Sequence, residues 1–123
     1  MTALDLPPTD TTPHVRYDAA SSTLRIEGES YPENVSDFYA PLFSWLREFL
    51  ADKPAFKVVL AFSYLNTSST KALLDLLLQL DDYHRSGGQI EVEWHYRPAL
   101  EVMQEAGEEF GEDLSLPYRL VAI

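Results

Sequence analysis

The sequence predicts an α/β fold, a single domain in which about five strands form a mixed β-sheet and three main helices pack against it. Short apolar segments rich in β-branched and aromatic residues alternate with longer segments of helical period, as is typical of α/β layers. The chain has 123 residues, of which 46% are hydrophobic. This length supports one hydrophobic core but not two. The expected order is strand, strand, helix, strand, helix, strand, helix, strand.

The first residues of the chain differ in composition from the rest. Residues 1–14 combine three prolines with threonines and aspartates, and they show no apolar period. We predict a flexible or loosely docked arm there, followed by one domain over residues 15–123. The domain begins with a β-hairpin, because residues 15–18 and 24–27 alternate apolar and polar side chains around a short turn. One face of this hairpin is expected to be open to water.

The central elements follow from hydrophobic period. A first helix is expected from Asn34 or Ser36 to about Ala51, where apolar residues recur at helical spacing. Pro41 lies inside this pattern, so the helix either kinks there or begins its regular part later. Residues 56–62 predict a buried strand. A second helix from residue 68 to about residue 85 ends at two glycines, which can adopt the left-handed conformation that terminates helices.

The last third of the chain supplies three more elements. Residues 89–96 alternate as a strand, Pro98 opens a short acidic helix that runs through Phe110, and residues 117–123 form a final strand. Crossover connections in such a sheet gather helix N-termini at one edge, where sites form outside the carboxyl ends of the strands. We therefore expect the turn Tyr31–Asn34 to approach the turn Asn66–Ser69.

Composition excludes several classes of function. The formal net charge is -11, from 20 acidic and 9 basic side chains. Such a charge repels phosphate backbones and anionic lipids, so we expect no nucleic-acid partner. The absence of cysteine excludes disulfides and cysteine-ligated metal sites. We see no long apolar segment and no export leader, and we expect a cytoplasmic protein with no membrane association.

The sequence offers little support for catalysis. The three histidines, His14, His84 and His95, are scattered over an arm, a helix end and a strand end, and their spacing predicts no metal site. Gly87 and Gly88 end a helix instead of opening one, so no glycine-rich phosphate loop is present and no nucleotide binding is expected. We predict that the protein is not an enzyme and needs no cofactor.

A run of hydroxyl side chains separates the central strand from the second helix. Thr67, Ser68, Ser69 and Thr70 follow Asn66, where the first backbone N–H groups of the helix lack intrahelical partners. One interpretation is that Thr67 or Ser68 simply caps the helix, and spacing alone favours this. A cap needs only one side-chain oxygen, however. The surplus of hydroxyls suggests a phosphorylation site, because a helix N-terminus favours an added phosphate.

The second helix carries more leucine than one sheet face requires. Leu73, Leu76, Leu77 and Leu80 form a core stripe, and Leu74 and Leu78 widen it. Either the first helix or an external partner could cover the additional width, and we favour packing within the chain. If the leucines are exposed, they adjoin Thr67, and a phosphate there would oppose a docked partner through charge and desolvation cost.

Several motifs closely resemble those of the SiaC-type regulatory phosphoprotein family. The most specific are Ser-Tyr-Pro-Glu-Asn at residues 30–34 and Asn-Thr-Ser-Ser at residues 66–69. The resemblance also rests on further matching segments: Gly28-Glu29, Phe38-Tyr39, Trp45-Leu46, Tyr64-Leu65, Lys71, Trp94-His95-Tyr96 and Glu105-Ala106-Gly107-Glu108-Glu109-Phe110. It covers nearly everything after the arm. The element order is also similar to the STAS fold of anti-sigma-factor antagonists.

The resemblance implies a bacterial partner-switching protein. It implies phosphorylation by a serine/threonine kinase, dephosphorylation by a PP2C-type phosphatase, and binding of a diguanylate cyclase that the unmodified form activates, which promotes cyclic-di-GMP synthesis and biofilm formation. The family's phosphosite falls on Thr67, with Ser68, Ser69 and Thr70 as alternatives. The partner-binding residues implied or inferred nearby are Tyr31, Glu33, Asn34, Tyr64, Asn66, Ser68, Lys71, Leu74 and Leu78.

Two alternative functions stay open at this point. One is an anti-sigma-factor antagonist, which is a similar switch with a different client. The other is a small-ligand sensor that uses the turns Tyr31–Asn34 and Asn66–Ser69 as a polar pocket. The two can be distinguished by the identity of a bound partner and by stabilisation with a ligand.

Overall fold

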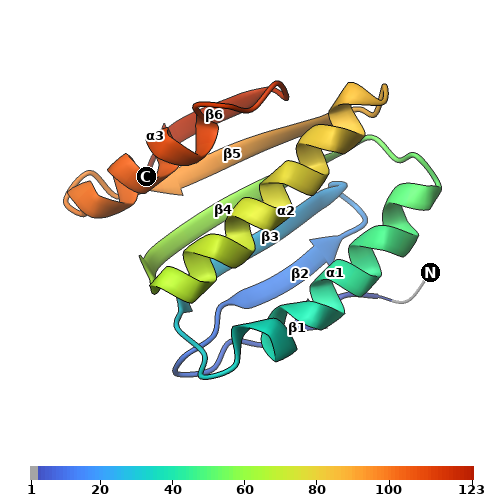
Figure 1. Ribbon diagram of the computed structural model, residues 1–123. Coiled ribbons are helices and arrows are strands. Elements are labelled where there is room, and N and C mark those ends of the chain that lie inside the picture. The colour runs from blue at the N-terminus through green and yellow to red at the C-terminus, as the bar shows by residue number, and fades with distance from the viewer. Residues whose placement is uncertain (1–2) are drawn as a thin grey trace.

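The computed structural model describes residues 3–123, so the first two residues of the predicted arm lie outside the described part. Within this range the chain forms a mixed sheet of six strands and three helices (Figure 1). The strands are β1 (Asp5–Leu6), β2 (His14–Asp18), β3 (Thr23–Ser30), β4 (Phe56–Leu65), β5 (Ile90–Tyr96) and β6 (Tyr118–Ala122). The helices are α1 (Val35–Ala51), α2 (Thr67–Arg85) and α3 (Glu101–Gly111). The predicted α/β class and element order are confirmed.

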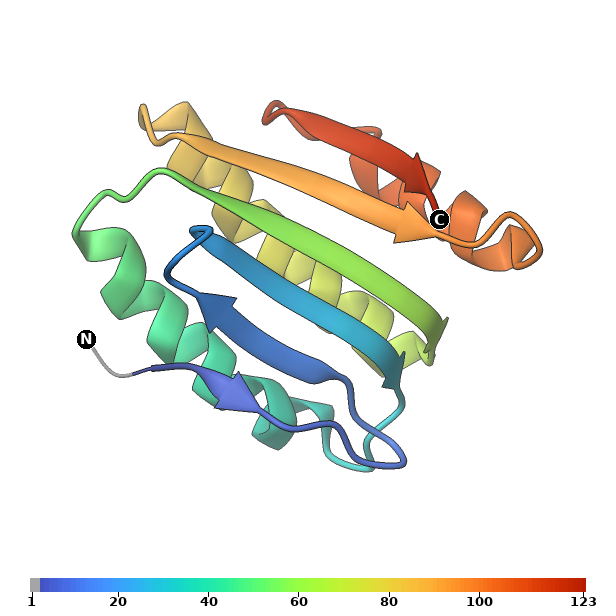
Figure 2. The ribbon, with the colours of Figure 1, turned by 180° about the vertical axis from the view of Figure 1, so that it is seen from behind.

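The strands lie in the sheet in the order of the sequence. The pairs β1–β2 and β2–β3 are antiparallel, whereas β3, β4, β5 and β6 are parallel. All three helices cover one face of the sheet, and the opposite face carries none of them (Figures 1 and 2). The parallel connections therefore bring the N-termini of α1 and α2 to the same edge, at the carboxyl ends of β3 and β4.

The core lies between the sheet and the helix layer. The helix-facing positions of the central strands are fully buried, including Leu24, Ile26, Val58 and Leu60. At the other end of the sheet, the Trp94 ring packs against Phe110, and its Nε1 donates a hydrogen bond to the Met103 carbonyl. The core stripe of α2 is buried as predicted, at positions Leu73, Leu76, Leu77 and Leu80.

The predicted flexible arm is corrected by the structure over residues 3–14. Asp5 and Leu6 form β1, which pairs with β2, and Leu4 is buried. The Tyr17 amide donates to the Leu4 carbonyl at 3.1 Å, and Tyr31 donates to Thr11 at 2.8 Å. The segment is held because it satisfies backbone groups at the edge of β2 and covers apolar surface there. With β1 at its edge, the sheet has six strands, one more than the sequence predicted.

Pro41 does not interrupt the first helix. The helix is continuous from Val35 to Ala51, and its N-cap is Asn34. Pro41 removes only one backbone donor, and ten residues of helix separate it from Asp52, where the helix ends. None of the helices within residues 3–123 has the length and apolar character of a membrane span.

Candidate functional site

Asn66 is the N-cap of α2, and this corrects the prediction that Thr67 or Ser68 caps the helix. Asn66 has an extended backbone, with φ of -83° and ψ of 173°, and its side chain accepts a hydrogen bond from the Ser69 amide at 2.8 Å. An asparagine in this conformation satisfies one of the unpaired N–H groups of the first turn. Thr67 is therefore the first helical residue, and the cap does not use its hydroxyl.

The four hydroxyls, Thr67 and its three alternatives, differ in their surroundings. Ser69 is fully buried, and its Oγ lies 2.8 Å from Ser30 Oγ, so the structure removes Ser69 from the accessible candidates. Thr70 Oγ1 donates to the Asn66 carbonyl at 3.0 Å. Thr67 and Ser68 are exposed, and neither hydroxyl has a hydrogen-bond partner within residues 3–123. Thr67 and Ser68 are therefore the two exposed hydroxyls of this run that have no hydrogen-bond partner within residues 3–123.

The local electrostatics favour a negative group at this end of α2. The first turn contains no acidic residue, and the unpaired N–H groups give the helix N-terminus a partial positive charge. Lys71 follows Thr67 by four residues, which places both on one side of the helix. Lys71 is exposed and forms no ion pair within the described part of the chain. A phosphate on Thr67 would therefore meet favourable charges from its own helix.

The two predicted turns lie together at this edge of the sheet. The Asn66 amide donates to the Ser30 carbonyl at 3.1 Å, and the rings of Tyr31 and Tyr64 meet edge to face, with their centroids 5.7 Å apart. A bulge in the β3–β4 pairing precedes them, next to Gly28, whose φ of 119° is costly for any other residue. The turns are thus joined through the backbone and through an exposed aromatic pair.

A buried hydroxyl network ties α1 and α2 to β3 beneath these turns. Ser30 Oγ lies 2.7 Å from Tyr39 Oη and 2.8 Å from Ser69 Oγ. Burial raises the pKa of the Tyr39 hydroxyl, and the Ser30 contact opposes that rise. We did not predict Ser30 or Tyr39 as network members. The one signal in the sequence is that Ser30 is polar at a helix-facing position of β3, after Leu24 and Ile26.

The residues of the turn Tyr31–Asn34 have different roles. Asn34 caps α1, because its Oδ1 accepts from the Asp37 amide at 3.1 Å and its Nδ2 donates to the Asp37 carboxylate at 2.9 Å. Glu33 is exposed and has no ion pair within residues 3–123. The structure therefore gives Asn34 a local structural task and leaves Glu33 accessible to a partner.

One side of α2 presents an exposed stripe that begins at Thr67. Lys71, Leu74 and Leu78 follow at intervals of four, seven and eleven residues, which is the spacing of a single helix face. Leu74 is 43% exposed and Leu78 is 48% exposed. The preferred interpretation that these leucines pack within the chain is wrong, because both remain nearly half exposed although α1 lies beside α2. We call Thr67, Lys71, Leu74 and Leu78 the α2 stripe.

A groove between α1 and α2 runs beside this stripe, with a volume of about 340 Å³. Ser68 and Lys71 line it from α2, and Val35 and Phe43 line it from α1. The groove combines apolar walls with the charged ends of Lys71 and Asp75. Such a surface suits a partner helix or loop better than a small polar ligand.

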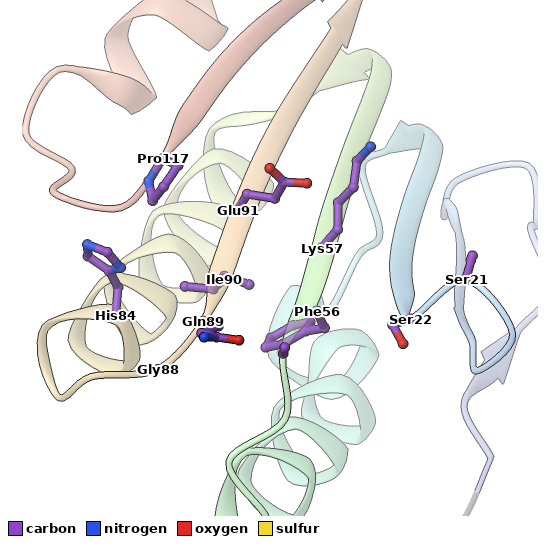
Figure 3. Close-up of a pocket in the computed structure, with 11 residues that line it drawn as sticks. Ser21, Ser22, Phe56, Lys57, His84, Gly88, Gln89, Ile90, Glu91 and Pro117 are labelled. Atoms are coloured by element: carbon purple, nitrogen blue, oxygen red, sulfur yellow. The ribbon is translucent and has the colours of Figure 1, made fainter.

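A cavity of about 540 Å³ lies at the opposite end of the parallel strands, where Ser22, Phe56 and His84 contribute to its wall (Figure 3). Among residues 3–123, no group of histidine, aspartate and glutamate side chains could hold a metal ion. Its ionisable side chains, Lys57, His84 and Glu91, come from three separate elements, and within residues 3–123 they form no hydrogen bond or ion pair with one another.

Comparison with known proteins agrees with this arrangement. The family model described as SiaC family regulatory phosphoprotein matches residues 6–123. An uncharacterized protein of Pseudomonas aeruginosa (strain UCBPP-PA14) is 37% identical over 123 residues, covering 99% of this chain and 98% of that protein. The solved structure of SiaC of Pseudomonas aeruginosa has a TM-score of 0.92 at 36% identity and covers 100% of both chains.

A further solved structure contains a relative in a complex. It is described as the diguanylate cyclase SiaD in complex with its activator SiaC, from Pseudomonas aeruginosa. The match has a TM-score of 0.92 at 37% identity and covers 98% of this chain and 99% of that chain. The family model spans nearly the whole sequence, and the relatives match over their full length. The chain therefore belongs to the SiaC family of regulatory phosphoproteins.

Proposed function

We propose that this chain is a non-enzymatic, cytoplasmic phospho-switch whose unphosphorylated form binds and activates a diguanylate cyclase. The observation that carries the proposal is the position of Thr67. Its hydroxyl is exposed at the start of α2, the helix is already capped by Asn66, and the exposed α2 stripe begins at this residue. The hydroxyl can therefore be modified without loss of the cap.

In the unphosphorylated form, the α2 stripe offers an apolar docking surface. Leu74 and Leu78 are large, exposed and one turn apart. Tyr31 and Tyr64 add an exposed aromatic pair near the N-terminal end of α2. Exposed apolar groups of this kind mark interaction surfaces. A partner that covers them gains hydrophobic free energy, because both leucines remain nearly half exposed.

Phosphorylation of Thr67 would change this surface without unfolding it. A phosphate adds roughly 1.5 to 2 negative charges at neutral pH. The helix N-terminus and Lys71 can stabilise these charges locally. Leu74 follows Thr67 by seven residues, which corresponds to about 10 Å along the helix axis. A partner seated on the leucines would then have to desolvate the phosphate, and binding would weaken.

The client and the modifying enzymes are proposed from the relatives. The solved relative is described as an activator of the diguanylate cyclase SiaD, and it matches this chain over its full length. We therefore propose a diguanylate cyclase as the client, with control of cyclic-di-GMP and biofilm formation as the outcome. A serine/threonine kinase and a PP2C-type phosphatase would set the phosphorylation state of Thr67.

The test compares variants of Thr67 for binding to the purified cyclase of the same organism. Thr67→Ala should bind and activate the cyclase as the unmodified protein does, whereas Thr67→Asp should bind at least tenfold more weakly. Gln79→Asp is the matched control, because it adds one negative charge to an exposed position of α2 outside the stripe. Its affinity should stay within twofold of the unmodified protein.

Equal binding and activation by Thr67→Ala and Thr67→Asp would contradict the switch. If neither folded variant binds the cyclase, the client is different. The anti-sigma-factor antagonist and the small-ligand sensor are then the hypotheses to test next, by partner identification and by ligand-induced changes in melting temperature.

A further inference from the structure

The sheet face opposite the helices carries a charged row that the switch does not use. None of the three helices formed by residues 3–123 covers this face (Figure 2). The register places Arg16, Arg25, Val59, Glu93 and Arg119 side by side across five strands, from β2 to β6. Their neighbours along the chain, such as Leu24, Ile26 and Val58, face the core, so these five side chains lie on the open face.

Basic residues are concentrated in this row although the chain is strongly acidic. The sequence has 9 basic residues against 20 acidic ones. Arg16, Arg25 and Arg119 lie in the row, and Lys57 lies on the same face of β4, next to Glu91 of β5 (Figure 3). Almost half of the positive charge of the chain thus gathers on one face of the sheet.

Arg16 and Arg25 form an unfavourable pair in the absence of a ligand. They are directly opposite each other in the antiparallel pair of β2 and β3. Like charges at such positions repel, because the Cβ atoms of opposite residues are only about 5 Å apart. Arg16 has no ion pair within residues 3–123, and Arg25 reaches Glu27 only at 4.0 Å. The two guanidinium groups therefore lack a carboxylate that would neutralise both.

The carboxylates nearby are already engaged. Asp18 accepts hydrogen bonds from the Ala20 amide and from Ser21 Oγ, both at 3.0 Å, and so holds the turn between β2 and β3. Glu93 contacts Lys57 at 3.0 Å and also Arg119. Neither carboxylate forms an ion pair with Arg16 or Arg25 among the described residues, so these arginines remain available to an external anion.

A cavity is present at this point of the face. It has a volume of about 270 Å³, and Arg16, Arg25 and Lys57 line it together with Thr23. The two engaged carboxylates, Asp18 and Glu93, also belong to its wall. Val59 forms an apolar part of its wall and is only 1% exposed, although it lies on the open face. The long side chains around Val59 therefore stand above the sheet as a rim, which gives the cavity depth.

We propose that this cavity is a binding site for a small oxyanion, with a phosphate or carboxylate group held between Arg16 and Arg25. Guanidinium groups bind such groups with two parallel hydrogen bonds. An oxyanion between the two arginines replaces their repulsion with two attractive contacts. The Thr23 hydroxyl already donates to the Ser21 carbonyl at 3.1 Å, so the two arginines supply the hydrogen bonds to the anion. The volume admits a small metabolite and excludes a large cofactor.

The test uses the full chain and two probes, inorganic phosphate and citrate, at constant ionic strength. Amide chemical shifts should change at residues 16–18 and 23–25, and the melting temperature should rise with probe concentration. Shifts with phosphate alone or with citrate alone identify the source of the oxyanion, and shifts with both indicate a general oxyanion site.

Arg16→Gln should weaken binding at least tenfold. It should not lower the melting temperature of the free protein, because it relieves the repulsion. The matched control is Arg47→Gln, which removes one positive charge from an exposed position of α1, in the helix layer. Its affinity should stay within twofold of the unmodified protein. The proposal fails if neither probe, at a concentration of about 10 mM, changes the amide chemical shifts of these residues. It also fails if Arg47→Gln weakens binding as much as Arg16→Gln.

Discussion

Glu93 is expected to make a large, pH-dependent contribution to the stability of this protein. Its side chain is almost fully buried, with the residue 6% exposed, on the open face of the sheet. His95 Nε2 lies 2.9 Å from Glu93 Oε1, Lys57 Nζ lies 3.0 Å from Oε2, and Arg119 also contacts Oε2. The perturbation is Glu93→Gln, which keeps the shape of the side chain and removes its charge.

The magnitude follows from the pKa of this carboxyl. The hydrogen bond with His95, followed by the contacts with Lys57 and Arg119, lowers the pKa of Glu93 from 4.5 to about 2 against the opposing effect of burial. Each pKa unit corresponds to about 1.36 kcal/mol. The ionised form thus contributes about 3 kcal/mol to folding at neutral pH. Glu93→Gln should lower the free energy of unfolding by roughly this amount.

The sign of the pH dependence is fixed by the direction of the pKa change. A carboxyl whose pKa is lower in the folded state stabilises the fold above the pKa of the unfolded chain. This contribution is complete above about pH 4.5 and is lost as the pH falls toward 2. The difference between the unmodified protein and Glu93→Gln should therefore shrink from about 3 kcal/mol at pH 7 to less than about 0.5 kcal/mol at pH 2.

Urea unfolding followed by circular dichroism, at several values of pH between 2 and 7, measures this difference directly. Glu91→Gln is the control, because Glu91 lies on the same strand and the same face but is exposed. Its effect should stay within about 0.5 kcal/mol. A difference for Glu93→Gln that stays constant from pH 7 to pH 2, or that is absent at pH 7, would refute the reasoning.

Three further predictions follow from the packing. Asn66→Ala should lower the free energy of unfolding by about 1 kcal/mol and the melting temperature by about 4 °C, because it removes the cap of α2. Thr67→Ala should change the free energy of unfolding by less than about 0.5 kcal/mol. Equal losses for the two variants would make Thr67 the cap. Tyr39→Phe should cost about 1 to 2 kcal/mol and speed amide exchange at the start of α2, because the buried Ser30 hydroxyl loses one of its two hydrogen-bond partners; unchanged exchange would exclude this coupling. Gly107→Ala should cost about 1 to 3 kcal/mol and alter tryptophan fluorescence, because a Cβ there would overlap the Trp94 ring; an unchanged emission spectrum would argue against this contact.

Local patterns in the sequence determined most of the elements. The β-branched run of residues 56–62 and the helical period of residues 68–85 are properties of neighbouring residues, and the structure forms β4 and α2 there. The order of these elements also placed the turns Tyr31–Asn34 and Asn66–Ser69 at one edge of the sheet, because parallel strands bring equivalent ends together. The position of the candidate site therefore followed from the sequence.

Tertiary structure decided which residues of that site are free. Asparagine, threonine and serine all make good caps, and only the backbone conformation around Asn66 selects one of them. The Ser30–Ser69 contact joins residues 39 positions apart, so no local pattern could reveal that Ser69 is buried. The same holds for Leu74 and Leu78, whose exposure depends on how α1 packs beside α2.

The edge strand β1 and the open face of the sheet also depended partly on local sequence and partly on tertiary structure. β1 has two residues, which is too short for a period, and it forms because the edge of β2 offers unpaired backbone groups. The alternation in β2 and β3 determined that Arg16 and Arg25 lie on the water-exposed face. Only the strand register placed them opposite each other, because register depends on pairing between strands and not on the sequence of either strand alone.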